Sequence, residues 1–477
     1  MNRAFQFLTI GIFLILLLPW LIQDGMFMDG MIYATVAKNL AFGQGSWWHL
    51  HLTSFLSDQY YDQPPLTIWI TSLFFKVLGK SLYTERIYSF LTAIINLLLI
   101  KKIWKIIFCK EKSLQTFWWL PVLFWIICPA CFWSFTNNME ENTMSIFILS
   151  SIIFLLNGFY LNKNRIWNVI FMALAIFLAA MCKGIQGTFP LTGIIILGFT
   201  VKQISFKESI VQTLLLFSLF AGLITLLFQY SPALEYFENY YRVRIVNTFS
   251  NPYSATTTTH FYLLFRLALE ELIPVIITCL IIFAARKNKI HDSQHYKSLA
   301  YVFLLLTVAG TLPLLLTAEQ RRFYLVPVYP LFALSLSLLV INHLKGLFEK
   351  YSSNNKIKSI HGISILIITL TIFLTIENFG KAKRDQVMLH DIHLAGENLS
   401  GIKIISLDPS LYSNWSLHLY FKRYYDISLN PNIAQEEYFL TEKNKSEHPA
   451  GFSDSGLRLL KYKLWINDST AVKVITN

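Results

Sequence analysis

Long apolar runs recur along this 477-residue chain and limit its fold more than any other feature. They have about 17 to 23 residues, which is enough for a helix to cross roughly 30 Å of hydrocarbon at 1.5 Å per residue. Hydrophobic residues make up 54% of the sequence and charged residues only 14%, more apolar material than a soluble core of this size needs. We therefore expect a mainly α-helical, polytopic membrane protein with about eleven transmembrane helices. The spans are placed near residues 5–22, 82–100, 117–135, 140–161, 166–182, 188–200, 209–229, 263–285, 299–317, 323–342 and 361–377.

The positions of the basic residues indicate which connections between the spans face the cytoplasm. The formal net charge is +12, but the basic residues form short clusters between apolar runs instead of the single patch that nucleic-acid binding needs. The clusters alternate with eleven spans, and the positive-inside rule places them in the cytoplasm. The N-terminus is then cytoplasmic and the C-terminal region lies outside. These clusters contain Lys101, Lys102, Lys105, Lys110 and Lys112, Lys163 and Arg165, Lys202 and Lys207, Arg286, Lys287 and Lys289, and Lys345, Lys350, Lys356 and Lys358.

Two domains follow from this pattern. Residues 1–380 form a transmembrane domain, in which residues 23–81 are a first outer loop with interfacial helices. Ile32, Val36 and Leu40 recur at helical spacing within 30–42, which predicts an amphipathic helix lying on the membrane with Lys38 and Asn39 facing elsewhere. A second helix is expected from Pro64 and Pro65 to Gly79.

The apolar runs shorten to strand length beyond residue 381, at 402–407, 425–429 and 471–475, with a helical stretch over 412–424. We expect a small α/β domain over 381–477 on the outer side.

Acidic residues on the outer side are the first candidates for chemistry. Asp29 and Asp62 each stand at the start of an expected helix, where helix capping is the alternative to a functional role. Glu140, Glu141 and Asn142 lie where the third span turns into the fourth. Acidic groups at membrane level cost roughly 2.5 to 3.5 kcal/mol at mid-bilayer, so they are functional candidates, with solvated loop carboxylates as the alternative.

Basic residues on the outer side form a second group of candidates. Lys183 lies at the outer end of a span, against the charge bias and beside Gly184, so a lipid phosphate is a plausible partner and a snorkelling lysine the alternative. Other outer cations together predict a phosphate site, although each alone is also compatible with lipid headgroups. They are Arg242, Arg244, His260, Arg321 and Arg322.

The motifs occur in an order that resembles a known group. They are Asp29-Gly30-x-x-Tyr33-Ala34, Tyr61-Asp62-Gln63-Pro64-Pro65-Leu66, Leu78-Gly79, Glu85-Arg86, Lys183-Gly184, and Arg322-Phe323-Tyr324 continuing to Pro330. Over about residues 20–340 the chain resembles the bacterial protein O-mannosyltransferase and aminoarabinose transferase group, in the C superfamily of membrane glycosyltransferases. One departure is that many relatives have a Glu-Lys pair where this chain has Asp62-Gln63.

This resemblance implies a bacterial inner-membrane enzyme that moves a sugar from a polyprenyl-phosphate donor to a lipid, glycan or protein acceptor at the outer face. It implies Asp29 as the catalytic base or as a carboxylate that orients the acceptor, and we assign it as the base. We expect Asp62 and Glu141 to position the acceptor or sugar. The proposed phosphate partners are Lys183, Arg242 and Arg322. No cofactor is implied, and a divalent cation is left open. The remaining substrate-binding candidates are Tyr33, Tyr61, Glu140, Asn142, Arg244, His260, Arg321 and Tyr324.

Two other functions remain open. A transporter or flippase for a lipid carrier would also have many spans and a few membrane-level charges, although no internal repeat of the kind found in transporters is evident. A noncatalytic envelope-assembly protein would keep its function when Asp29 is exchanged for Asn.

Overall fold

The structure is a computed structural model that describes residues 1–201, 203–246, 261–290, 296–317, 319–432, 436–445 and 449–469. The chain divides into two compact units, which are described separately. The helical unit contains Met1–Leu21, Tyr61–Thr67 and Ser89–Asn378. The sheet unit contains Ile22–Tyr60, Ile68–Tyr88 and Phe379–Asn477.

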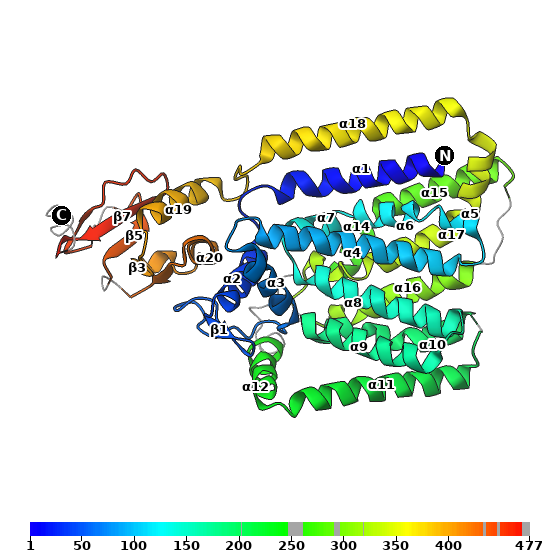
Figure 1. Ribbon diagram of the computed structural model, residues 1–477, viewed down its shortest axis with the longest axis horizontal. Helices are drawn as coiled ribbons and strands as arrows, with labels where there is room; N and C mark the ends of the chain where they lie inside the picture. Colours follow the sequence, from blue (N-terminus) through cyan, green and yellow to red (C-terminus); the bar gives the residue numbers. More distant parts are fainter. Residues whose placement is uncertain are drawn as a thin grey trace. The chain divides into compact units, whose positions relative to one another are not determined.

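The helical unit consists of long helices that run back and forth beside one another (Figure 1). In this unit α1 lies along α18, α8 along α9, and α16 along α17. The α-helices that build it are α1 (Asn2–Leu21), α4 (Thr84–Ile107, which begins in the sheet unit), α5 (Lys112–Gln115), α6 (Trp119–Ile126), α7 (Pro129–Thr136), α8 (Glu140–Leu155), α9 (Arg165–Lys183), α10 (Gly193–Val201), α11 (Phe206–Phe228), α12 (Ser231–Tyr240), α14 (Tyr262–Glu270), α15 (Leu272–Lys287), α16 (Lys297–Thr311), α17 (Tyr329–Tyr351) and α18 (Asn354–Asn378).

Shorter helical turns of other types connect them. Among the described residues two are π-helical and three are 3-10 helices, and several lie at the ends of long helices. These segments are η1 (Leu156–Tyr160), η2 (Gly184–Thr192), η3 (Tyr241–Val246), η6 (Leu312–Leu316) and η7 (Arg322–Leu325).

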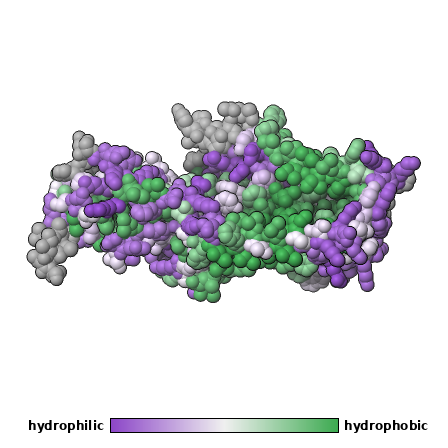
Figure 2. All heavy atoms as spheres, turned by 90° about the horizontal axis from the view of Figure 1, so that it is seen from above, coloured by the Kyte–Doolittle hydropathy of each residue, from purple (hydrophilic) through white to green (hydrophobic). Residues whose placement is uncertain are grey.

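Many of these helices match the dimensions of a bilayer. Within the described part of the chain, seven helical segments are long and apolar enough to cross a membrane, and up to nine if each bent helix pair is one span. Figure 2 shows a broad apolar surface over the helical unit, with a hydrophilic rim at the end where Figure 1 places the N-terminus. The expected mainly helical protein with many membrane-length helices is confirmed.

Prolines account for the two bends. Helices α6 and α7 meet at 79°, and α7 begins at Pro129, which cannot donate a backbone hydrogen bond to the preceding turn. Helices α14 and α15 meet at 52°. Pro274 lies four residues after Glu270, so the carbonyl of Glu270 cannot receive the usual helical hydrogen bond. The expected span 323–342 also differs, because α17 begins only at Tyr329 with Pro330 in its first turn.

In the part of the sheet unit that the structure describes, five strands form a mixed sheet in the order β4-β3-β5-β7-β6. β3 pairs in parallel with β4 and β5, whereas β7 is antiparallel to β5 and β6. The expected strands near 402–407 and 425–429 correspond to β3 and β4, and the expected 471–475 strand lies outside the described residues. The elements of this unit are α2 (Met28–Ala41), β1 (Gly45–Ser46), β2 (His49–Leu50), α3 (Leu66–Leu78, which begins in the helical unit), α19 (Gln386–Asn398), β3 (Ile404–Leu407), η8 (Pro409–Leu411), α20 (Trp415–Tyr425), β4 (Ser428–Asn430), β5 (Tyr438–Glu442), β6 (Phe452–Asp454) and β7 (Tyr462–Asn467).

The prediction that 30–42 is an amphipathic helix on the membrane surface is wrong in one respect. The helix exists as α2, but every residue from Gly30 to Leu40 is buried, so it has no polar face toward water. Lys38 donates to Asp426 at 2.5 Å, and the Asn39 amide donates to the carbonyls of His51 and Leu52. The polar residues that suggested an exposed face are therefore held by partners inside the sheet unit.

Candidate functional site

A buried ion-pair cluster lies where α8 begins and α9 ends, within the helical unit. The two helices run side by side in opposite directions, so Glu140 and Glu141 in the first turn of α8 face Lys183 at the end of α9. The Lys183 Nζ lies 2.8 Å from Glu141 Oε1 and 3.7 Å from Glu140 Oε2. The carboxylates are fully buried, and Lys183 is 8% exposed. These residues are thus neither solvated loop carboxylates nor a snorkelling lysine.

Gly184 fits this corner because it needs no side chain. Its φ is +65°, and an added Cβ would lie 2.6 Å from the Tyr240 hydroxyl oxygen. Burial raises the pKa of Tyr240 to about 12, against the lowering effect of Arg244 and Lys183, so the hydroxyl stays protonated at neutral pH. Gly184 therefore lets the Tyr240 hydroxyl lie close to the backbone at this corner.

A second group of charges gathers around Arg244 in η3. Its guanidinium nitrogens lie 2.8 Å from Glu319 Oε2 and 3.6 Å from Asp62 Oδ1. The same guanidinium donates to the Tyr324 hydroxyl at 3.3 Å. Arg321 lies 3.6 Å from Glu319 and has an exposed side chain. Asp62 and Arg244, which are far apart in the sequence, are thus brought together.

One pocket joins the two charged groups. It has a volume of about 530 Å³, and Lys183 and Arg244 both contribute to its wall together with Glu319 and Tyr324. The rest of its lining is largely apolar and comes from η2, α11, α16 and η6. The pocket therefore combines charged side chains with a largely apolar lining. Its lining consists of Gln63, Lys183, Ile185, Gln186, Thr188, Phe189, Leu191, Thr192, Phe217, Tyr240, Arg244, Ala309, Gly310, Pro313, Leu314, Leu316, Thr317, Glu319 and Tyr324.

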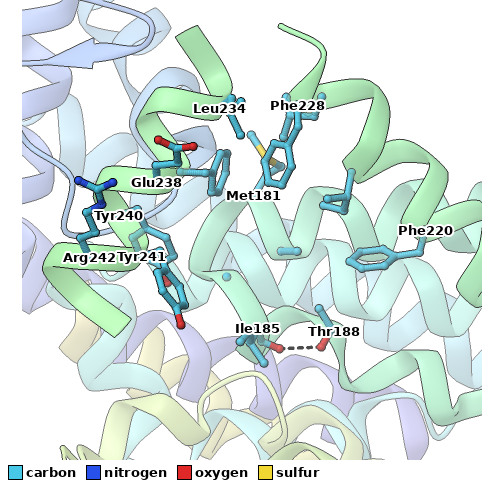
Figure 3. Close-up of a pocket in the computed structure, with 15 residues that line it drawn as sticks. Met181, Ile185, Thr188, Phe220, Phe228, Leu234, Glu238, Tyr240, Tyr241 and Arg242 are labelled. Atoms are coloured by element: carbon cyan, nitrogen blue, oxygen red, sulfur yellow. Dashed lines mark hydrogen bonds between the residues drawn. The ribbon is translucent and has the colours of Figure 1, made fainter. Parts of the chain in front are cut away.

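A neighbouring pocket of about 640 Å³ shares Ile185, Thr188 and Tyr240 with the first. Figure 3 shows apolar and aromatic side chains from α9, α11 and α12 around this space, with Glu238 and Arg242 to one side. The Thr188 hydroxyl donates to the Ile185 carbonyl at 2.8 Å, which satisfies that polar group locally. The lining of this second pocket is suited to hydrocarbon.

Arg322 is engaged elsewhere in the helical unit. Its guanidinium lies 3.8 Å from Glu270 and stacks over Trp133. Glu270 also pairs with Arg266, one helical turn away, at 2.5 Å, and accepts a hydrogen bond from the Ala130 amide in the first turn of α7. Glu270 therefore connects the two bent helix pairs.

Asn142 also has local partners. Its side chain accepts from the Ser134 hydroxyl at 2.6 Å, and its backbone carbonyl accepts from the Asn96 amide at 3.0 Å. Tyr61 contacts Tyr236 edge to face, and the Tyr236 hydroxyl donates to the Gln63 carbonyl at 2.7 Å. These contacts hold the segment that carries Asp62.

Three candidates remain. His260 lies outside the described residues. Asp29 and Tyr33 belong to the sheet unit, where Tyr33 is buried in α2. Asp29 stands in the first turn of α2, whose N-cap position is occupied by Phe27, so Asp29 is not the capping residue. A carboxylate in a first turn is nevertheless favoured by the partial positive charge of the helix start.

Several residues that line the pocket were not predicted from the sequence. Glu319 precedes Arg321 and Arg322, so the charge run was visible, but nothing indicated that Arg244 was its partner. Tyr240 and Gln186 carried no local signal, because tyrosine and glutamine recur along the chain. Within the described ranges, no group of three or more His, Cys, Asp or Glu side chains is arranged to hold a metal ion.

Comparison with known proteins connects this architecture to other membrane proteins. Residues 62–228 match the family model described as dolichyl-phosphate-mannose-protein mannosyltransferase. The crystal structure of ArnT from Cupriavidus metallidurans bound to undecaprenyl phosphate is similar with a TM-score of 0.61 at 12% identity, covering 96% of this chain and 97% of that chain. The apo structure of the same protein gives 0.57 at 11% identity, covering 96% and 95%. A comparison with curated proteins finds no match.

The matched segment includes Asp62, Glu140, Glu141 and Lys183, and the fold similarity extends over nearly the whole chain. Together they confirm the resemblance of this chain to the C superfamily of membrane glycosyltransferases, which its motifs predicted.

Proposed function

We propose that this protein transfers a sugar from a polyprenyl-phosphate carrier to an acceptor hydroxyl or phosphate at the outer membrane face, with inversion of configuration. The observation that carries the proposal is the pocket that Lys183 and Arg244 share with apolar side chains. A polyprenyl phosphate has the same division into an anionic head and a hydrocarbon tail. Apolar burial stabilises the tail by about 25 cal/mol per Å², and the two cations suit the phosphate.

The comparisons support the same ligand class. The matching family model is named for dolichyl-phosphate-mannose, and the similar ArnT structure holds undecaprenyl phosphate. Both are polyprenyl-type phosphates. We extend this property to the present chain because its own pocket combines fixed cations with a hydrocarbon wall.

The proposed reaction is a single displacement. The acceptor oxygen forms a bond to the anomeric carbon while the bond from that carbon to the carrier phosphate oxygen breaks. The electron pair stays on the phosphate, and the acceptor proton passes to a carboxylate. We assign Asp29 as this base on the strength of the resemblance. Asp62 and Glu141 position substrate groups, either directly or through Arg244 and Lys183.

Cations beside the carrier phosphate stabilise the negative charge that develops as the glycosidic bond breaks. Lys183 and Arg244 are each paired with carboxylates, which hold them in place before the ligand binds. An ammonium has three donors and a guanidinium five, so each of these cations can bind more than one oxygen at the same time. Arg242 borders the neighbouring pocket and Arg322 contacts Glu270. Their proposed phosphate role is therefore secondary to that of Arg244.

The topology remains part of the proposal. The proposed eleven spans include α4, whose ends carry several charges. They also divide residues 165–201 into two spans with a turn at Gly184. This arrangement places the N-terminus in the bacterial cytoplasm, and residues 381–477 lie outside together with the segments of the first outer loop that share their compact unit. The sheet described for residues 404–467 supports the α/β fold expected there.

Transfer of radiolabelled sugar from a panel of polyprenyl-phosphate sugars to membrane extract tests the function. We expect the purified wild type to transfer label from at least one donor, and Asp29→Asn to lose about 100-fold or more at unchanged thermal stability. Asp58→Asn is the matched control, because Asp58 is an exposed carboxylate of the same outer loop with 77% side-chain exposure. If Asp29→Asn transfers as much label as the wild type, Asp29 is not the catalytic base. Movement of the carrier across vesicles without any transfer would indicate a flippase instead.

A further inference from the structure

The sheet unit contains a pocket that the proposed transferase reaction does not use. Its volume is about 490 Å³. One wall comes from the first outer loop, with His51 and Ser54, and the opposite wall from β3, α20 and β4, with Lys403, Lys422 and Ser428. Both walls belong to the same compact unit. The pocket is thus a defined feature of that unit.

Lys422 is the unusual residue of this pocket. It lies near the end of α20, is only 5% exposed and lines the cavity. Across the described ranges of the chain, its ammonium makes neither a hydrogen bond nor an ion pair. A charge on a largely buried side chain without an ion-pair partner is costly, because partial desolvation disfavours it. The neighbouring Lys38 is buried to a similar degree but is fully paired.

The one carboxylate that lines this pocket is already occupied. Asp426 lies 2.5 Å from the Lys38 Nζ and 2.6 Å from the Lys80 Nζ. Burial alone would raise the pKa of Asp426, but these two lysines hold it well below its ordinary value. The Asp426 carboxylate is therefore already neutralised by Lys38 and Lys80 and does not form an ion pair with Lys422.

Positive charge is in excess around the cavity. Lys38 and Lys80 pair with the Asp426 carboxylate, and Lys403 and Lys422 line the same pocket as Asp426. Burial lowers the pKa of Lys422, the Asp426 carboxylate raises it, and the charges of Lys403 and Lys80 lower it further. An incoming anion would relieve this repulsion and offset the desolvation of Lys422.

We propose that this pocket binds a phosphate group, carried either on a sugar or on a lipid headgroup, through Lys422 and Lys403. Separate ammonium donors act as point charges that suit a multiply charged tetrahedral oxyanion. The Ser54 and Ser428 side chains in the wall add hydroxyl donors. The proposal stands on the geometry of the sheet unit alone and does not rest on the transferase function.

Isothermal titration of the purified full-length protein in neutral detergent with inorganic phosphate tests this site. Potassium chloride at matched ionic strength controls for screening. We expect saturable binding by the wild type and at least about tenfold weaker binding by Lys422→Gln, because a charged hydrogen bond is lost. Lys403→Gln should weaken binding about threefold, since that lysine is exposed at the mouth. Lys461→Gln removes the same charge from an exposed position outside the pocket and should bind as the wild type does.

Competition then identifies the carrier of the phosphate. Displacement by glucose 1-phosphate supports a phosphorylated sugar, and displacement by dihexanoyl phosphatidylglycerol supports a lipid headgroup. If Lys422→Gln fails to fold, the comparison of Lys403→Gln with Lys461→Gln still decides the question. Absence of saturable phosphate binding by folded wild type, or equal affinities in Lys403→Gln and Lys461→Gln, would overturn the proposal.

Discussion

Replacement of Lys183 by methionine tests the physical account of the buried cluster. Methionine keeps most of the lysine stem and removes its charge, so packing changes little. The two carboxylates of Glu140 and Glu141 are fully buried and would lose the cation that lies 3.7 Å from Glu140 and 2.8 Å from Glu141. The substitution therefore isolates the electrostatic role of this lysine.

The expected magnitude follows from the burial of the partners. Removal of one member of a buried ion pair costs about 3–5 kcal/mol, because an uncompensated charge stays in a low-dielectric site. Replacement of all the charges by neutral groups of similar volume is often close to neutral. We therefore expect Lys183→Met to lose about 3–5 kcal/mol of unfolding free energy. The triple variant Lys183→Met, Glu140→Gln, Glu141→Gln should recover most of that loss.

Equilibrium unfolding in mixed micelles measures these differences, with Lys105→Met as control because Lys105 is exposed near the end of α4. The control should stay within about 0.5 kcal/mol of the wild type. A loss below about 1 kcal/mol in Lys183→Met, or a triple variant no more stable than the single one, would refute the reasoning. Sugar transfer gives a second readout. If Lys183 binds the carrier phosphate, the triple variant regains stability and remains inactive.

Two further predictions concern backbone strain and pH. Gly184→Ala should lower unfolding free energy by about 1–2 kcal/mol, since its φ of +65° is unfavourable for alanine and the new Cβ would meet Tyr240. The control Gly222→Ala in α11 has open space around it and should not destabilise in the same thermal melt. Asp426 has a lowered pKa, so its contribution to stability is present above about pH 3.9, the ordinary value in the unfolded chain, and is lost as the pH falls below it. Thermal melts of wild type should therefore weaken more on acidification from pH 5 to pH 3 than those of Asp426→Asn, and parallel curves would contradict the role of its pairing with Lys38.

Local signals in the sequence predicted much of the architecture. Apolar run length set the helical membrane fold, because each span must satisfy its backbone hydrogen bonds within itself. The short runs near 402–407 and 425–429 predicted β3 and β4. The start of α8 at Glu140 and the end of α9 at Lys183 were also close to expectation. The positions of these helices and strands depend mainly on residues that are close together in the sequence.

The errors and omissions involve distant partners. The chain suggested an exposed polar face at Lys38, but its carboxylate partner Asp426 lies almost four hundred positions away. The bend between α14 and α15 depends on Pro274, whose effect within an apolar run was not expected.

Apolar run lengths and charge positions alone indicate a helical membrane protein and single out the polar residues that stand against its apolar background. The pairing of those residues depends on the folded chain: Lys183 meets Glu141, and Arg244 meets Asp62 and Glu319. The reason is physical. Hydrophobic length and charge alternation are read along the chain, whereas a buried charge is tolerated only beside a partner that folding brings to it from elsewhere.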